Sequence, residues 1–141
     1  MTIPLWVLLA FAVWTIAVLM VGIGVRRWTL ILTGRAQLME FPADTPHGSL
    51  AYRRAIRAHA NCLENLPVYS AIVIAGYASQ TNASVMGWLA IVFLIARVLQ
   101  SLVHMIFTET NLTVFVRFAF FFTQIIAMLW MAVEVARHAS L

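Results

Sequence analysis

An uncharged apolar run near the N-terminus most strongly constrains how this chain can fold. The run extends from Ile3 to Val25 and holds 23 residues without one Asp, Glu, Lys or Arg. As an α-helix rising about 1.5 Å per residue it would be about 34 Å long, enough to cross the hydrocarbon core of a bilayer. A cleaved signal peptide would need a basic start and a shorter apolar core, and the run has neither. We therefore interpret it as a membrane span.

The composition extends this interpretation to the whole chain of 141 residues. Hydrophobic residues make up 63% of it and charged residues 10%, against roughly 25% charged residues in a typical soluble domain. A soluble globule of this size could not bury so much apolar surface. A disordered chain would be poorer in apolar residues. We predict an all-α integral membrane protein with a single domain, residues 1–141.

Four apolar runs predict four spans. They cover about residues 3–25, 58–78, 85–107 and 112–135, and the first connection, residues 26–57, is long and polar. That connection carries Arg26, Arg27, Arg35, Arg53, Arg54 and Arg57 against Glu40 and Asp44. The positive-inside rule places it in the cytoplasm and both chain termini on the other side of the membrane.

The remaining composition excludes several classes of function. All nine basic residues are Arg, and the net charge is +4. These arginines lie beside or within apolar runs and form no solvated basic face, so we expect no nucleic-acid partner. The single Cys62 excludes an intrachain disulfide, and it is interpreted as a packing residue. No metal site is expected.

Polar residues inside the predicted spans are informative, because a charge at a span centre costs roughly 2.5–3.5 kcal/mol on insertion scales. Such side chains are expected to face the bundle interior and to pair there. They belong to three stripes at helical spacing, one along each of the last three predicted helices, and the first stripe begins in the connection before its span. The stripes are Arg53, Arg57, Asn61 and Glu64; Arg97, Gln100, Ser101 and His104; and Thr113, Arg117 and Gln124.

The topology is expected to bring these stripes together. Glu64, His104 and Arg117 are predicted to lie at a similar, shallow depth in the cytoplasmic leaflet, with Arg97 deeper. The arginines Arg57, Arg97 and Arg117 against Glu64 leave an excess of +2. A purely structural network would tend towards neutrality, because uncompensated buried charge is costly. The excess instead favours an anionic ligand that bears carboxylates.

The segment Arg53–Pro67 resembles the signature of the membrane-associated proteins in eicosanoid and glutathione metabolism, the MAPEG family. That signature is Arg-Ala-His or Arg-Ala-Gln, then Asn two residues on, Glu three further and then Pro. Arg57-Ala58-His59, Asn61, Glu64 and Pro67 match it. The resemblance covers essentially the whole chain and implies a left-handed bundle of four transmembrane helices that assembles as a homotrimer. The chain is most similar to bacterial-type members, which implies the inner membrane.

The resemblance also implies residue roles. Glutathione would bind between subunits as co-substrate and would conjugate or reduce lipophilic electrophiles that arrive from the lipid bilayer, as in a glutathione S-transferase. The side chains expected to hold glutathione are Arg53, Arg57, Asn61, Glu64, Arg97 and Gln100. Arg117 and His104 would be catalytic, with Arg117 stabilising the thiolate. One of Arg26, Arg27 or Arg35 would reach the site, with no choice among them.

Two alternatives stay open at this point. A small four-span transporter would use Glu64 as a proton- or cation-coupling carboxylate, although arginines on the same helix would keep that carboxylate ionised. A family-like membrane protein without catalysis would keep only a structural or partner role.

The predicted topology can be tested with reporters fused after Leu141. We expect a periplasmic reporter to be active there and a cytoplasmic reporter to be silent, because the arginine-rich first connection should be retained in the cytoplasm. A cytoplasmic signal after Leu141 would contradict this orientation.

Overall fold

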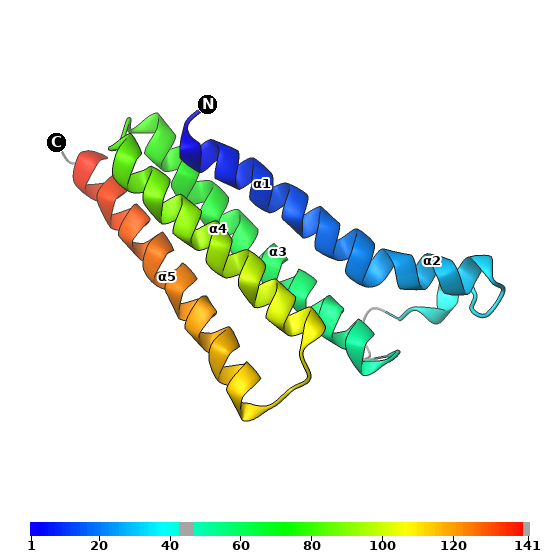
Figure 1. Ribbon diagram of the computed structural model, residues 1–141. Coiled ribbons are helices and arrows are strands. Elements are labelled where there is room, and N and C mark those ends of the chain that lie inside the picture. The colour runs from blue at the N-terminus through cyan, green and yellow to red at the C-terminus, as the bar shows by residue number, and fades with distance from the viewer. Residues whose placement is uncertain (43–46, 140–141) are drawn as a thin grey trace.

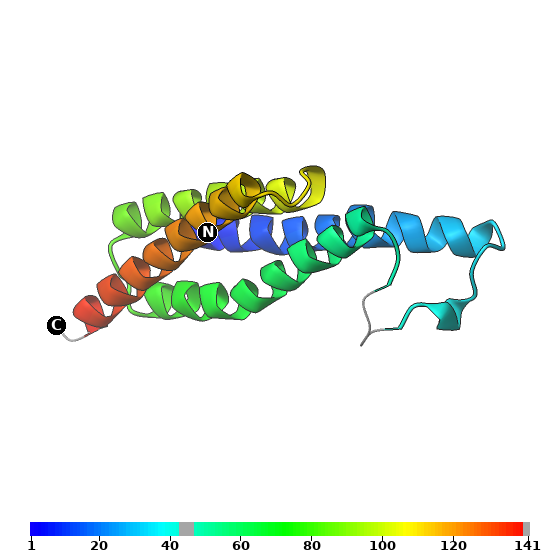
Figure 2. The ribbon, with the colours of Figure 1, turned by 90° about the horizontal axis from the view of Figure 1, so that it is seen from below.

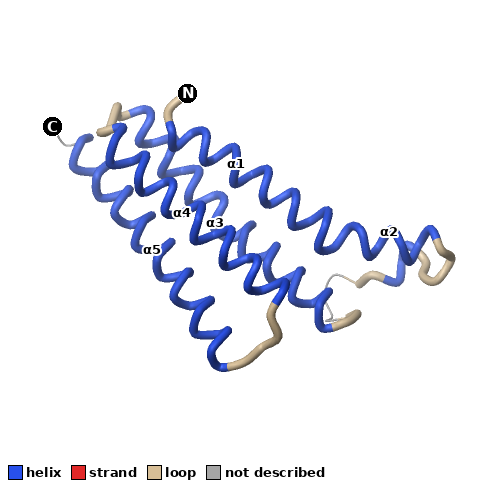
Figure 3. Tube along the Cα trace, in the orientation of Figure 1, coloured by secondary structure: helices blue, strands red, loops and turns tan. Residues whose placement is uncertain are grey.

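A computed structural model of the chain describes residues 1–42 and 47–139 as a bundle of long helices (Figure 1). Its elements are α1 (Ile3–Ala17), η1 (Val18–Gly24), α2 (Val25–Leu32), η2 (Leu38–Glu40), α3 (Leu50–Ala78), α4 (Ala83–Ile106) and α5 (Asn111–Ala139). The first three elements form one helical stretch of 30 residues. The described part of the chain contains no strand (Figure 3). Asp44, counted above in the first connection, lies outside the described residues.

The long helices alternate in direction, so the two ends of the bundle differ. The N-terminus, the end of α5 and the turn between α3 and α4 lie at one end (Figure 1). The connection between α2 and α3 and the turn between α4 and α5 lie at the other. α4 packs against α1, α3 and α5. The arginine-rich connection therefore lies at the end where α3 and α5 begin and α4 finishes.

Three helical stretches are long and apolar enough to cross a membrane, namely Ile3–Leu32, α4 and α5. Their surfaces carry large apolar side chains such as Trp88 and Phe115, which are 70% and 69% exposed. Such surfaces suit lipid better than water. α3 is not in this group, because its arginines, Asn61 and Glu64 lower its mean hydropathy.

Two helices extend past the predicted spans towards the arginine-rich end. The first continues from Val25 to Leu32, and α3 begins at Leu50, well before residue 58. No proline or glycine interrupts either extension, so the helices continue beyond the apolar runs. The third and fourth predicted spans differ from α4 and α5 by at most four residues at each end.

Local capping explains where α2 ends and where α3 begins. Gly34, with a φ of +67°, follows α2, and the Arg35 N–H donates to the Leu30 carbonyl at 2.9 Å. Glycine is favoured there because this left-handed cap strains other residues. At the start of α3 the Ser49 hydroxyl accepts a hydrogen bond from the Tyr52 N–H at 3.3 Å, a typical helix N-cap.

Pro67 lies inside α3. Figure 2 shows that this helix bends part-way along its length. Proline has no N–H to donate to the carbonyl four residues earlier, and its ring crowds that carbonyl, so a kink is expected. The bend is consistent with a kink at Pro67.

An aromatic cluster forms the core between α1, α3 and α4. The rings of Tyr69 and Phe93 stack with centroids 4.3 Å apart, and Phe11 meets their edges at 6.2 and 5.3 Å. All three side chains are fully buried. Met128 and Met131 of α5 complete this core, which lies in the half of the bundle away from the arginine-rich end.

A close helix contact lies nearer the arginine-rich end. A Cβ placed on Gly22, in the π-helical segment η1, would lie only 2.9 Å from the Ala55 Cβ on α3. Because neither group has a flexible side chain, the two backbones could not keep their separation if Gly22 gained a side chain. Small residues are common at such contacts between membrane helices.

We predict that Gly22→Ala destabilises the protein by about 1–3 kcal/mol, the usual cost of overpacking. Gly24→Ala is the matched control, because its nearest neighbour, the Leu19 carbonyl oxygen, is 3.5 Å away, an ordinary contact. The control should be neutral or stabilising by up to about 1 kcal/mol, since alanine favours a helix over glycine. Thermal unfolding in detergent measures both. Equal effects of the two substitutions would contradict the close contact.

Candidate functional site

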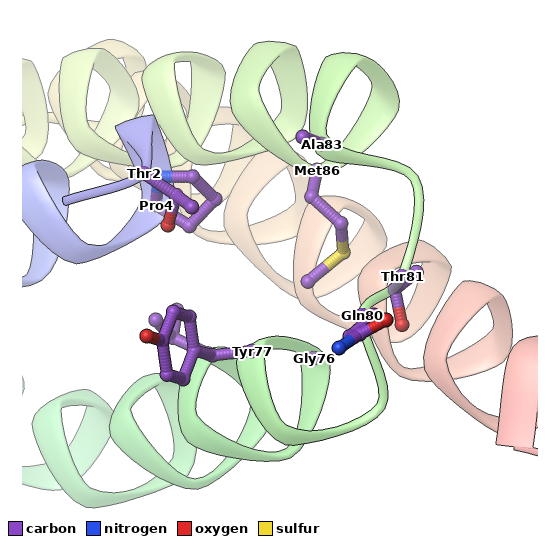
Figure 4. Close-up of a pocket in the computed structure, with 9 residues that line it drawn as sticks. Thr2, Pro4, Gly76, Tyr77, Gln80, Thr81, Ala83 and Met86 are labelled. Carbon is purple, nitrogen blue, oxygen red and sulfur yellow. The ribbon is translucent and has the colours of Figure 1, made fainter.

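A pocket of about 250 Å³ lies at the end of the bundle that holds the N-terminus (Figure 4). It is lined by Thr2, Pro4, Val73, Gly76, Tyr77, Gln80, Thr81, Ala83 and Met86. None of these described lining residues carries a charge. The pocket therefore offers no group that would fix an anionic ligand.

A second pocket, of about 270 Å³, lies between α3, α4 and α5 towards the opposite, arginine-rich end. Its lining residues are Arg57, Asn61, Gln100, His104, Val114, Arg117, Phe118 and Phe121. The side chains from α3 and α4 are polar, whereas α5 contributes Arg117 among apolar and aromatic ones. A pocket that joins cationic donors to an aromatic wall is the better candidate site.

His104 links the three helices around this pocket. Its Nδ1 lies 3.0 Å from Arg117 Nη1, and its Nε2 lies 3.2 Å from the Asn61 side-chain amide nitrogen. His104 is on α4, Asn61 on α3 and Arg117 on α5. The buried imidazole of His104 therefore contacts one side chain from each of the two neighbouring helices.

The chemistry of these groups fixes the histidine tautomer. An Arg guanidinium can only donate, so His104 Nδ1 must accept and the proton of the neutral ring must sit on Nε2. That N–H then needs an acceptor, which the Asn61 amide nitrogen facing it cannot be, so the amide must be turned to bring its oxygen to the ring. An amide can turn by 180° without changing shape. In this arrangement the Asn61 NH₂ is left to donate elsewhere in the pocket.

A ladder of amide side chains lies beneath the pocket. Gln124 donates to the Gln100 carbonyl oxygen at 3.0 Å, and Asn65 donates to the Gln124 carbonyl oxygen at 3.4 Å. Gln100 in turn donates to the backbone carbonyl of Arg117 at 3.1 Å. Gln124 is fully buried. The ladder therefore fixes the α5 backbone at Arg117 relative to α3 and α4.

Glu109, in the turn between α4 and α5, pairs with two arginines of the pocket. Its Oε1 lies 2.6 Å from Arg57 NH1 and 3.7 Å from Arg117 NH1. The Arg117 side chain is only 12% exposed, whereas those of Arg57 and Glu109 are 60% and 47% exposed. One carboxylate oxygen thus joins α3 to α5 at the edge of the pocket.

Residues 3–137 match the MAPEG family over nearly the whole chain. The chain belongs to the MAPEG family. Together with its three membrane-length apolar helices, this identifies it as an integral membrane protein. No curated protein and no solved structure matches the chain.

Five of the predicted site residues meet at the second pocket. Arg57, Asn61, Gln100, His104 and Arg117 all line it. This is the convergence of three helices that the spacing of polar residues predicted. Their roles towards glutathione stay predictions.

Glu64 is placed differently from its expected partners. At about 100° per residue it lies about 20° from Arg57 around the axis of α3, and about 60° from Asn61. Its side chain is on the exposed face of α3, and the described residues give it no ion pair. The arginine cluster of the pocket is paired by Glu109 instead. The sequence did not single out Glu109, because it lies outside the predicted spans. The feature that could have identified it is its position as the acidic residue in the short turn before Arg117.

Arg97 lies away from the pocket lining. Its side chain is 1% exposed, its guanidinium is 6.0 Å from the Phe11 ring, and its Nε and NH2 have no hydrogen-bond partner. Cys62 and Glu64 are its electrostatic neighbours. Its depth in the membrane relative to the other polar residues stays a prediction.

The other predicted arginines do not line the pocket. Arg26 donates to the Ser49 hydroxyl, and Arg27 donates to the Tyr52 hydroxyl, so both tie α2 to the start of α3. Arg35 is exposed beyond α2 and Arg53 is half-buried on α3. The described part of the chain contains no group of three or more His, Cys, Asp or Glu side chains that could hold a metal ion.

We predict that His104 carries its proton on Nε2 and none on Nδ1. Nitrogen NMR of the protein labelled with ¹⁵N-histidine reports the protonation of each ring nitrogen, and His104→Asn identifies the His104 signals by their loss. Histidines 47, 59 and 138 serve as internal references. A His104 ring protonated on Nδ1 would be incompatible with a hydrogen bond from Arg117.

Proposed function

We propose that this chain is a membrane-embedded, glutathione-dependent enzyme of the transferase or peroxidase-like kind that acts on lipophilic electrophiles. Membership of the MAPEG family supports this class of function. The observation that carries the proposal is the two-sided pocket between α3, α4 and α5, with Arg57 and Arg117 beside Phe118 and Phe121.

The two sides of the pocket suit the two substrates. Arginine binds carboxylates through paired N–H donors, so Arg57 and Arg117 are suited to an anionic thiol such as glutathione. Phe118 and Phe121 are 55% and 37% exposed on α5, a helix of membrane-spanning length. An apolar electrophile dissolved in lipid could reach the pocket along this aromatic surface without crossing water.

Arg117 is proposed to activate the thiol. A free cysteine thiol has a pKa of about 8.5, so little of it is ionised at neutral pH. A fixed cation nearby favours the thiolate, and Arg does not lose its proton at physiological pH. The thiolate sulfur would attack the electrophilic carbon, form the C–S bond and displace the leaving group with its electron pair. His104 and the amide ladder would hold Arg117 in place.

We further propose four membrane-spanning helices in a left-handed bundle, assembled as a homotrimer. Glutathione would bind between subunits, and Arg53, Glu64, Arg97 and Gln100 would contribute as the resemblance implies. α3 supports this assembly, because it is the least apolar long helix and exposes Glu64 beside small residues, Ala71 and Ala75. Covering this face with a second subunit would remove a carboxylate from lipid. The orientation follows the positive-inside rule, with both termini outside the cytoplasm, in a bacterial inner membrane.

The transporter alternative receives less support. A coupling carboxylate would be expected to line a path through the bundle interior. Glu64 lies on the outer face of α3 in the single chain. Thiol-dependent chemistry would distinguish the proposed enzyme both from a transporter and from a family member without catalysis.

We predict that Arg117→Ala raises the thiol pKa of bound glutathione by a unit or more, with about a tenfold loss of thiolate per unit at neutral pH. Ultraviolet absorbance of the thiolate, titrated against pH in the presence of purified protein, measures it. Arg137→Ala, near the other end of α5, is the control and should leave the titration unchanged.

Two results would count against the proposal. Absence of a thiolate signal in the wild-type protein, with no binding of glutathione, would overturn the proposed function. An unchanged thiol pKa in a folded Arg117→Ala variant that still binds glutathione would exclude Arg117 as the activating cation.

A further inference from the structure

The carboxylate of Glu109 occupies a position that an anionic ligand would also seek. Its Oε1 is 2.6 Å from Arg57 NH1 and 3.7 Å from Arg117 NH1. Both arginines line the pocket between α3, α4 and α5, whereas Glu109 lies at its edge. In this structure the cationic donors of the pocket are therefore already engaged by a carboxylate of the chain itself.

Glu109 also changes the charge of the site. Without it, Arg57 and Arg117 present two positive charges to a ligand, and with it they present a net charge of one. A second carboxylate that approaches the same N–H groups meets both the competition of Glu109 for these donors and the repulsion of its negative charge.

We propose that Glu109 is a specificity-determining residue that competes with anionic ligands for Arg57 and Arg117, so that a carboxylate-bearing thiol binds by displacing it. This inference rests on the proposed function for the class of ligand. It adds that binding exchanges one carboxylate for another. A ligand then gains affinity chiefly from the contacts it makes besides this ion pair, and thiols with a single carboxylate and few other contacts are disfavoured.

The hydrogen bonds that hold the turn carrying Glu109 do not depend on its side chain. The Thr113 N–H bonds to the Thr110 hydroxyl at 3.2 Å, and the Thr113 hydroxyl donates to the Thr108 carbonyl at 2.9 Å. These bonds hold the turn and the start of α5, and none of them uses the Glu109 carboxylate. Arg57 and Glu109 are both about half exposed or more, and exposed ion pairs are weak. Release of Glu109 therefore leaves the fold intact at a small cost.

The test is the affinity of the purified full-length protein for glutathione, measured by calorimetry in detergent. Glu109→Gln should bind glutathione about twofold to fivefold more tightly than wild type, the range that an exposed ion pair allows. Glu134→Gln is the matched control, because Glu134 pairs with Arg137 near the far end of α5 and should leave the affinity unchanged. Glutathione diethyl ester, in which both carboxylates are esterified, should gain nothing from Glu109→Gln.

Equal or weaker glutathione binding by Glu109→Gln would overturn the competition while leaving the proposed function intact. The competition would also be overturned if Glu109→Gln increased the affinity for the diethyl ester as much as the affinity for glutathione. Failure of both proteins to bind glutathione would overturn the proposed function and this inference with it.

Discussion

Hydrogen bonds between polar side chains of α3, α4 and α5 decide how the arginine-rich half of this bundle is arranged. Within a membrane an unpaired polar group is costly, because lipid offers it no partner. His104 meets this constraint with one contact to Asn61 and one to Arg117, and Gln124 meets it with Gln100 and Asn65. The two sets of contacts hold the same three helices at two successive levels, so the relative position of the helices is fixed where the pocket opens.

Different interactions hold the helices together in the two halves of the bundle. In the half that contains the N-terminus, Phe11, Tyr69 and Phe93 pack as a close aromatic cluster. In the other half, directional bonds replace much of this packing and leave room for the second pocket. The pocket in the aromatic half carries no charged side chain among its described lining residues, whereas the pocket in the other half carries Arg57 and Arg117.

Much of this arrangement could be predicted from the sequence, because it follows from the helical periodicity of apolar and polar residues and from the free-energy cost of placing polar groups in lipid. The apolar runs located the long helices. The penalty for polar groups in lipid implied that Glu64, His104 and Arg117 would meet, and of these His104 and Arg117 line the pocket. The exposure of Glu64 could not be predicted, because helix periodicity fixes the angle between residues on α3 but not how that helix is rotated against α4 and α5. The role of Glu109 was missed for another reason: a turn has no periodicity, so its side-chain contacts depend on where the neighbouring helices end.

The ties between α2 and α3 bear on how the family can vary in length. Arg26 and Arg27 hold Ser49 and Tyr52, so the two helices are fastened at the base of the long connection. A connection closed at its base can gain or lose residues with little effect on the helices it joins, because the entropy of closing a loop grows only slowly with its length. This part of the chain is thus where evolution can add or remove segments on the arginine-rich side while the helices around the pocket keep their places.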